Sequence, residues 1–294
     1  MRRILVTGAA GFIGRHTCRE LASAGHQVTA VDVDGPRVMN MEGAGITSDI
    51  ADVTEDGDVD DFVRVHLPDA ILHLAANASV PRSMSEASAD AHLNIVGTVN
   101  VLEAAAKYGV RNVVCASSGG AVYGAADHPL TEDEPQRPAC PYGAGKAAAE
   151  QYMRYFAEHR GLCVTALRYS NVYGPGQNPD NGVVAAWRRL IVEGRNVTIY
   201  GDGTAVRDFV HVSDVVAANI KALTGSDGFM PFNIGTGVGT SLNELARLMG
   251  APGITYEPPR AGDLQWNVLN CARARRLLGW TARVSLKDGL ESLR

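Results

Sequence analysis

With 294 residues, of which 46% are hydrophobic and 20% charged, the chain has the composition of a globular enzyme and the length of about two domains. A net charge of −5 argues against general binding to nucleic acid or acidic membranes, which requires clustered Lys and Arg. The five cysteines form no C-x-x-C pair and the histidines show no metal spacing, so we expect neither disulfides nor a metal site. No signal peptide or membrane-spanning run is evident, which favours a soluble cytoplasmic protein.

The chain begins with a short apolar strand at residues 3–7, which leads into Gly8, Gly11 and Gly14 and then into a helical pattern. Glycines at such a turn let the backbone approach a phosphate group, and the N-terminus of the helix attracts negative charge. The spacing is G-x-x-G-x-x-G and not G-x-G-x-x-G. It predicts a dinucleotide site, the alternative being a purely structural turn.

The next predicted strand, residues 27–31, ends in Asp32, which lies eighteen residues beyond Gly14. A carboxylate at this strand end can accept hydrogen bonds from both hydroxyls of an adenosine ribose. It would repel the 2′-phosphate of NADP, and no Arg follows it directly. The pattern therefore favours NAD as the cofactor.

Strand and helix patterns then alternate, with strands expected at 70–74, 112–116 and 162–168 and helices at 86–107 and 142–159. This alternation predicts an α/β fold, a Rossmann-type, doubly wound parallel sheet of at least six strands. Beyond Gly174 the elements become shorter and more often broken by Gly and Pro, which predicts a smaller C-terminal lobe that binds substrate.

A strand at 209–212 and a capped helix from Ser213 could return to the main sheet. The predicted division is therefore an NAD-binding domain, residues 1–170 with about 205–230, and a lobe, residues 171–204 with 231–294.

Tyr142 and Lys146 are four residues apart in a predicted helix and share one of its faces. A tyrosine base requires such a neighbour, because lowering its pKa from ~10 to ~7 takes ~4 kcal/mol of preferential stabilisation of the phenolate. Ser117 and Ser118 end the preceding strand and are candidate catalytic hydroxyls.

Further motifs contain Asp49-Ile50, His73-Leu74-Ala75-Ala76, Asn94, residues 167–175, residues 207–212 and residues 260–263. With the glycine turn and the Tyr142/Lys146 pair, they resemble the extended short-chain dehydrogenase/reductases, and within these the NAD-dependent nucleotide-sugar epimerases and dehydratases. The resemblance covers nearly the whole chain.

The resemblance implies a role for each matching residue. Asp49 and Ile50 would hold the adenine, Tyr142 would be the catalytic base, and Lys146 would assist it and hold the nicotinamide ribose. The remaining cofactor-binding positions would be Gly8, Gly11, Phe12, Ile13, Gly14, Asp32, Leu74, Ala75, Ala76, Asn94 and Tyr169. The nucleotide diphosphate and sugar would contact Asn171, Arg207, Arg260, Asp263 and Asn267.

One position departs from the family pattern. The family usually has Ser or Thr four residues before the Tyr of a V-Y-G turn, whereas this chain has Gly119 there. Ser117 or Ser118 would then supply the hydroxyl, unless a water or a substrate hydroxyl does so. Gly120 and Ala121 lack the acids that the 4,6-dehydratases carry, which disfavours dehydration.

The expected activity is therefore 4-epimerisation of a nucleotide sugar, UDP-glucose and UDP-galactose above all, through a transient 4-keto sugar. Asn267, at a position that gates the sugar pocket in this family, leaves N-acetylated and uronic-acid sugars as alternatives. A reductase or decarboxylase of the same family, or a non-catalytic NAD-binding protein, are further alternatives.

A homodimer is also expected, because the predicted helices from Ala89 and from Tyr142 carry apolar or small residues on more than one face. Burial of these faces within the monomer is the alternative.

Overall fold

The computed structural model describes residues 1–225, 227–260 and 262–293, which form two compact units. Unit 1 comprises residues 1–117, 141–167 and 216–232, and unit 2 comprises residues 118–140, 168–215 and 233–294. These units differ from the predicted domains chiefly in residues 118–140 and 205–215, which lie in unit 2. Among the described residues, no helix combines the length and apolarity needed to cross a membrane.

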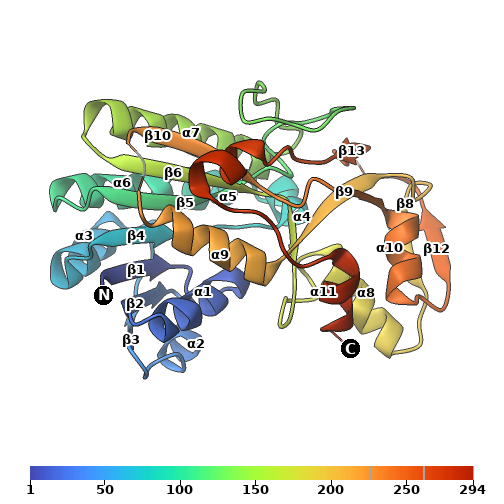
Figure 1. Ribbon diagram of the computed structural model, residues 1–294, viewed down its shortest axis with the longest axis horizontal. Coiled ribbons are helices and arrows are strands. Elements are labelled where there is room, and N and C mark those ends of the chain that lie inside the picture. Colours follow the sequence, from blue (N-terminus) through green and yellow to red (C-terminus); the bar gives the residue numbers. More distant parts are fainter. Residues whose placement is uncertain (226, 261, 294) are drawn as a thin grey trace. The chain divides into compact units, whose positions relative to one another are not determined.

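Unit 1 is built on a seven-stranded sheet with the order β10-β6-β5-β4-β1-β2-β3, which confirms the predicted parallel α/β fold (Figure 1). Its strands are β1 (Arg3–Thr7), β2 (Gln27–Asp32), β3 (Ile46–Ile50), β4 (Ala70–His73), β5 (Asn112–Ser118), β6 (Cys163–Tyr169) and β10 (Phe229–Ile234). β1 pairs in parallel with both β2 and β4, so the strand order reverses there. In open α/β sheets, ligands bind outside the carboxyl ends of the strands at such a reversal.

The helices of unit 1 cover both faces of this sheet. They are α1 (Phe12–Ser23), α2 (Gly35–Met39), α3 (Asp56–His66), α4 (Val80–Ser85), α5 (Ala87–Ala91), α6 (Gly97–Lys107), α7 (Pro141–His159) and α9 (Val212–Ala222). α3, α6 and α7 pack side by side, while α1 and α9 lie together in front of the sheet in Figure 1, where Asn219 donates to Thr17 (3.1 Å). Every residue of β4 is buried, as expected for a strand covered on both faces.

The stretch predicted as one helix over 86–107 is interrupted by the π-helical segment η1 (His92–Val96) between α5 and α6. Within it, the backbone carbonyl of Asn94 accepts a hydrogen bond from the Thr98 hydroxyl (2.7 Å). Single-turn π segments are frequent at functional sites because the extra residue redirects a side chain. Here the segment buries the side chain of Asn94 completely.

Unit 2 contains a four-stranded sheet, in which β9 (Val206–His211) pairs with β7 (Asn171–Tyr173), β11 (Gly239–Ser241) and β13 (Trp266–Asn267). β8 (Val197–Tyr200) and β12 (Ile254–Glu257) form a separate pair. The helical segments are α8 (Val183–Val192), α10 (Leu242–Met249), η2 (Ala274–Leu278) and α11 (Leu286–Glu291). Trp187, Ile199, Phe209 and Leu245 form much of its core.

The expectation that the strand at 209–212 could return to the main sheet is wrong, because β9 belongs to the unit 2 sheet. The reason lies in Asp208, a fully buried residue in the middle of β9. Its carboxylate accepts hydrogen bonds from the Thr236 hydroxyl (2.6 Å), the Gly237 amide (3.0 Å) and the Leu269 amide (3.3 Å). A buried carboxylate requires such donors, and segments of unit 2 supply them.

Candidate active site

The glycine turn leaves no room for side chains. Gly8 has φ +66°, and a Cβ atom there would lie 2.6 Å from the Ala75 nitrogen. A Cβ at Gly14 would lie 2.2 Å from the Gly8 oxygen. Gly11 is the N-cap of α1 and Phe12 and Ile13 are its first residues, so N–H groups without intrahelical partners face the turn. Such a cradle of backbone donors fits a pyrophosphate.

Asp32 ends β2 beside this turn. Its two carboxylate oxygens accept hydrogen bonds from the amides of Ala10 (2.9 Å) and Asp34 (3.0 Å), which fix its orientation. On the neighbouring strand, Ile50 pairs with Asp32, and Asp49 accepts from the Ile50 amide (2.9 Å). The Ile50 side chain is 55% exposed, which offers an apolar surface to a ring beside two carboxylates. The structure thus brings together the three residues predicted to hold adenosine.

A buried hydrogen-bond chain joins the ends of β1 and β4 to η1. The Thr98 hydroxyl donates to the Asn94 carbonyl, so its oxygen accepts from His73 Nε2 (3.2 Å). His73 Nδ1 then accepts from the Thr7 hydroxyl (2.8 Å), whose oxygen accepts from the Ala75 amide (3.4 Å). Burial lowers the pKa of His73 to about 3, with a further contribution from the Lys146 ammonium, so the ring is neutral. The chain supports the predicted cofactor positions Leu74, Ala75 and Ala76, which follow His73 directly.

Tyr142 and Lys146 lie in the first two turns of α7. Tyr142 is half-buried, whereas Lys146 is only 3% exposed. Burial lowers the pKa of Lys146 to about 8, although neighbouring Cys115, Asp90 and Glu150 act in the opposite direction. The predicted pair therefore exists as a partly accessible phenol one helical turn from a buried ammonium group.

Two carboxylates near Lys146 were missed at the sequence level. Glu150 is 2% exposed and accepts a hydrogen bond of 2.5 Å from the Ser117 hydroxyl. Asp90 accepts from the Asn77 amide through Oδ1 (2.8 Å). Its Oδ2 atom is buried without a hydrogen-bond partner among the described residues. Only Glu150 left a signal in the sequence, since it follows Lys146 by four residues, whereas Asp90 lies on a different helix.

The loop of unit 2 that begins at Ser118 explains the family departure at Gly119. A Cβ atom at Gly119 would lie 2.5 Å from Leu269 Cδ1 and 3.0 Å from the Arg168 carbonyl oxygen. The Gly119 amide donates to the Tyr169 carbonyl (2.8 Å), and its own carbonyl accepts from Asn267 (3.1 Å). A side chain at position 119 would therefore meet packed atoms on both sides.

Ser118 is half-buried, and its hydroxyl lies beside Gly120, as does the side chain of Asn171. A Cβ atom built on Gly120 would be 3.8 Å from both the Ser118 hydroxyl oxygen and Asn171 Oδ1, so these two polar groups flank the same glycine. Ser117 differs, because it is buried and its hydroxyl donates to Glu150.

The predicted substrate residues gather on the sheet of unit 2. Asn171 pairs with Phe209 across β7 and β9, and Asn267 pairs with Arg207 across β13 and β9. Asn267 is fully buried, and its Oδ1 atom has no hydrogen-bond partner among the described residues.

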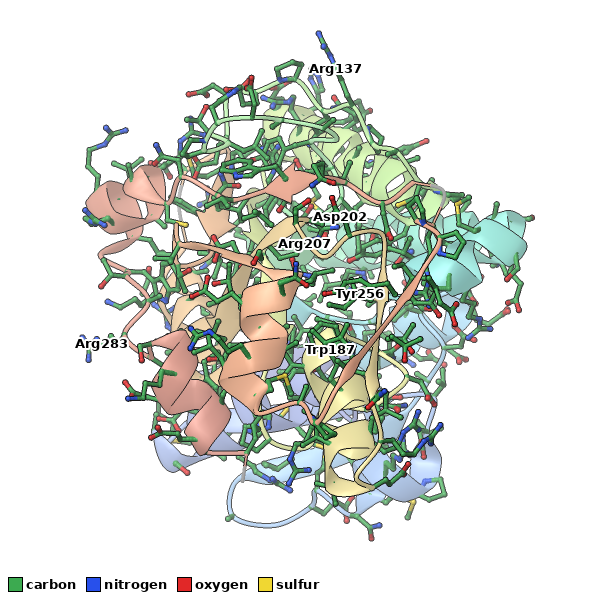
Figure 2. The ribbon with its side chains drawn as sticks, turned by 90° about the vertical axis from the view of Figure 1, so that its right-hand side faces the viewer. Arg137, Trp187, Asp202, Arg207, Tyr256 and Arg283 are labelled. Carbon is green, nitrogen blue, oxygen red and sulfur yellow. The ribbon has the colours of Figure 1, made fainter. Side chains whose placement is uncertain are left out.

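Two arginines of unit 2 differ in their surroundings. Figure 2 shows Arg207 on β9; burial lowers the pKa of its guanidinium, and the Asp263 carboxylate opposes this effect. The guanidinium of Arg260 is exposed and lies 3.5 Å from the centroid of the Tyr200 ring. Asp263 is exposed and its amide donates to the Arg260 carbonyl, while Ala261 of the same motif lies outside the described residues. Guanidinium groups suit a diphosphate because they form charge-assisted, bidentate hydrogen bonds.

Comparison with known proteins shows what the chain is similar to. The model of the NAD dependent epimerase/dehydratase family matches residues 4–235. A UDP-glucose 4-epimerase of Mycolicibacterium smegmatis is 42% identical over 98% of this chain and 96% of its own length. The structure of a UDP-glucose 4-epimerase from Thermotoga maritima with UDP-glucose superposes with a TM-score of 0.93, 39% identity, and coverage of 99% and 96%. That of MoeE5 with UDP-glucuronic acid and NAD gives a TM-score of 0.91, 38% identity, and coverage of 99% and 97%.

Proposed function

The chain belongs to the NAD dependent epimerase/dehydratase family, and on that premise we propose that it inverts C4 of a nucleotide hexose, with UDP-glucose and UDP-galactose as substrates. The observation that carries this proposal is the half-buried Tyr142 phenol one helical turn from the buried Lys146 ammonium, in the unit that holds the glycine turn. Relatives that bear the name UDP-glucose 4-epimerase support it.

NAD supplies, when bound, a reversible acceptor for the C4 hydride. Phe12, Ile13 and Gly14 would hold its pyrophosphate through the backbone amides at the start of α1. Gly8 and Gly11 would let the phosphate approach the turn, because neither carries a side chain, while the Gly11 amide itself donates to the Gly8 carbonyl (3.1 Å). Asp32 would accept the ribose hydroxyls, with Asp49 and Ile50 at the adenine. The remaining proposed cofactor contacts are Leu74, Ala75, Ala76, Asn94, Lys146 and Tyr169.

Tyr142 would remove the proton from the 4-hydroxyl as the hydride leaves C4. The Lys146 ammonium would stabilise the phenolate, sharing the ~4 kcal/mol needed to bring a tyrosine pKa from ~10 to ~7. The resulting 4-keto sugar would turn over in the site, and Tyr142 would return the proton to O4 as C4 regains its hydride on the other face. No net oxidation results, so the protein requires no second redox substrate.

Ser118 is the better candidate for the catalytic hydroxyl. Ser117 donates its hydroxyl hydrogen to the buried Glu150 carboxylate, so it has none to offer a sugar. Ser118 is half-buried and flanks Gly120 together with Asn171, one of the proposed substrate residues. We therefore assign Ser118 the hydrogen bond to the sugar O4 and Ser117 a supporting role.

Asn171, Arg207 and Arg260 would hold the nucleotide diphosphate, and the Asp263 carboxylate favours the charged form of Arg207. Asn267 would line the sugar pocket through its buried, unpartnered Oδ1 atom while its amide group stays on Gly119. A uronic-acid nucleotide sugar is the second candidate substrate, favoured by the similarity to MoeE5, which binds UDP-glucuronic acid. N-acetylated sugars belong in the same substrate panel.

We also propose a homodimer in the cytoplasm. Apolar side chains that are 38–51% exposed lie on α4, η1 and α7, namely Met84, Val96, Tyr152 and Tyr155, and a partner copy would cover them. The cysteines of the structure are free, as in a reducing compartment. Light scattering of the wild type and of Tyr155→Glu tests this proposal. The wild type should have twice the mass of the monomer, and Tyr155→Glu should have the mass of the monomer.

The decisive test is to incubate the purified protein with UDP-galactose, without added cofactor, and to separate the products by chromatography. UDP-glucose is the expected product, and Tyr142→Phe should lower turnover by about 10³-fold while NAD remains bound. Release of CO2 or of reduced cofactor would indicate a decarboxylase or a reductase instead. Absence of any product from the whole substrate panel would indicate a non-catalytic NAD-binding protein.

A further inference from the structure

Lys146 is a buried cation that the proposed reaction needs in its charged form. Taking an ammonium group out of water disfavours its charge, and burial does lower the pKa of Lys146 to about 8. A neutral amine could not stabilise a phenolate. Some group in the surroundings must therefore oppose the cost of burial at physiological pH.

Two of the groups that contact the site carry no charge there. Cys115 can oppose the effect of burial on Lys146 only as a thiolate, and burial raises the pKa of its thiol to about 12, so at physiological pH the thiol is protonated and adds no charge. His73 is neutral, since its pKa lies at about 3. Apart from Asp90, the charged residues on the helices packed against α7 are exposed; they are Arg82, Glu86, His92, Glu103 and Lys107.

The remaining groups are Asp90 and Glu150, both 2% exposed. Tyr142, Lys146 and Glu150 are spaced by four residues on α7, so they follow one another along one helix face. Asp90 approaches from α5, where its Oδ2 atom lies 3.3 Å from the position of a Cβ on Gly145, next to Lys146. Asp90 also accepts a hydrogen bond from the Asn77 side-chain amide, and Glu150 accepts one from the Ser117 hydroxyl.

We propose that Asp90 and Glu150 are positioning residues that keep the Lys146 ammonium charged in its buried place, and through it activate Tyr142. This inference rests on the proposed function for its catalytic consequence, but the state of Lys146 is independent of turnover. Glu150 is supported by Ser117, which explains why a buried serine precedes Ser118. A nearby opposite charge favours the charged form of a buried group by ~1–3 pK units, and both carboxylates act on Lys146 in this direction, against the effect of burial.

The chain has only four lysines, which makes the state of Lys146 directly observable. In NAD-loaded protein labelled with 13C at the lysine Cε, the exposed Lys107, Lys221 and Lys287 serve as internal references. Glu150→Gln removes the charge but keeps an oxygen that can accept the hydrogen bond from Ser117. Asp90→Asn likewise removes the charge and keeps an oxygen for the hydrogen bond from Asn77. Each should lower the titration midpoint of Lys146 by about one unit or more. Cys115→Ala should leave it unchanged.

The same variants should shift the alkaline limb of the kcat profile to lower pH, with about a threefold loss of kcat at pH 7.5 for a shift of one unit and an unchanged KM. If the midpoint shifts but kcat does not, the positioning role holds and the catalytic role assigned to Lys146 fails. Midpoints within a few tenths of a unit of wild type in the folded variants would overturn the inference. A titration midpoint of Lys146 below pH 7 in the wild-type protein would also overturn the inference, and this measurement requires no variant.

Discussion

Each unit contains a buried polar cluster, and the two clusters are satisfied to different degrees. The Lys146 cluster of unit 1 comprises Asp90, Asn94, Ser117, Lys146 and Glu150, and it includes two buried acceptor atoms without a partner among the described residues, Asp90 Oδ2 and Asn94 Oδ1. The Arg168 cluster of unit 2 comprises Tyr123, Glu132, Arg168 and Asn233, and it is closely hydrogen-bonded throughout.

In the Arg168 cluster, the guanidinium donates to the Tyr123 hydroxyl (2.7 Å) and to the Glu132 carbonyl (3.1 Å). Tyr123 donates to Asn233 Oδ1 (2.6 Å), and the backbone N–H of Asn233 donates to the Glu132 carboxylate (2.8 Å). A fully paired buried network rigidifies the fold, whereas unpaired buried acceptors are costly and persist at sites that take a ligand. The comparison predicts that substitutions in the Arg168 cluster lower stability, whereas substitutions in the Lys146 cluster lower the rate of catalysis.

The largest effect on stability should come from Arg168→Met. The substitution leaves the buried Tyr123 hydroxyl and the Glu132 carbonyl without the guanidinium that donates to them, and each such hydrogen bond to a charged group typically contributes about 1.5–3 kcal/mol. Urea unfolding followed by circular dichroism measures this loss, with Arg82→Met, at a 64% exposed ion pair, as the control. A loss of less than ~1 kcal/mol, as at the exposed control, would contradict a stabilising role for the Arg168 cluster.

Lys146→Met should show the opposite balance. Turnover of UDP-galactose should fall by about 10²-fold, because the phenolate of Tyr142 loses its neighbouring charge. The loss in free energy of unfolding should be less than half of that in Arg168→Met, because the substitution also removes the cost of burying the ammonium, which lowers the pKa of Lys146 to about 8. Asp90 and Glu150 retain Asn77 and Ser117 as donors. Steady-state kinetics and urea unfolding on the same preparation measure both effects. A larger loss of stability in Lys146→Met than in Arg168→Met would contradict the comparison.

Those parts of the site that depend on short sequence spacing could be predicted. The glycine turn, Asp32 at the end of the next strand, and Tyr142 with Lys146 lie within one element or one connection, so local geometry determines their arrangement. The parallel sheet followed from the alternation of apolar strands with helices, and the structure confirms it.

Parts that depend on contacts between distant segments could not be predicted. Asp90 reaches the Lys146 cluster only because α5 packs on α7, and Ser117 meets Glu150 across thirty-three residues. The assignment of β9 failed for the same kind of reason: a strand pattern reveals burial but not which partners supply donors to Asp208. The roles assigned to the individual site residues stay predictions.

Acid should destabilise the protein through His73. Its pKa is about 3 when folded and ~6.5 when unfolded, so between these values the unfolded chain binds the additional proton. Stability therefore falls as the pH drops below ~6.5, by about 2 kcal/mol at pH 5 from this residue alone. Urea unfolding of the wild type and of His73→Gln at pH 7.5 and pH 5 measures the contribution of His73 to this loss of stability. An equal loss in both proteins would show that His73 is not the source.

The smallest effect should come from Gly119→Ser, which restores the hydroxyl that the family usually has at this position. The new Cβ would meet Leu269 Cδ1 at 2.5 Å and the Arg168 carbonyl oxygen at 3.0 Å. The Leu269 contact is the end of a side chain that can rotate, so the cost should be about 1 kcal/mol, near the low end for overpacking. Turnover should not rise, because a side chain at position 119 points at Leu269, whereas the Ser118 hydroxyl lies beside Gly120, as does Asn171.

The paired control is Ser118→Ala, which should lower turnover by about 10²-fold with little change in stability. A gain in turnover for Gly119→Ser, or its rescue of Ser118→Ala, would transfer the catalytic hydroxyl from Ser118 to position 119.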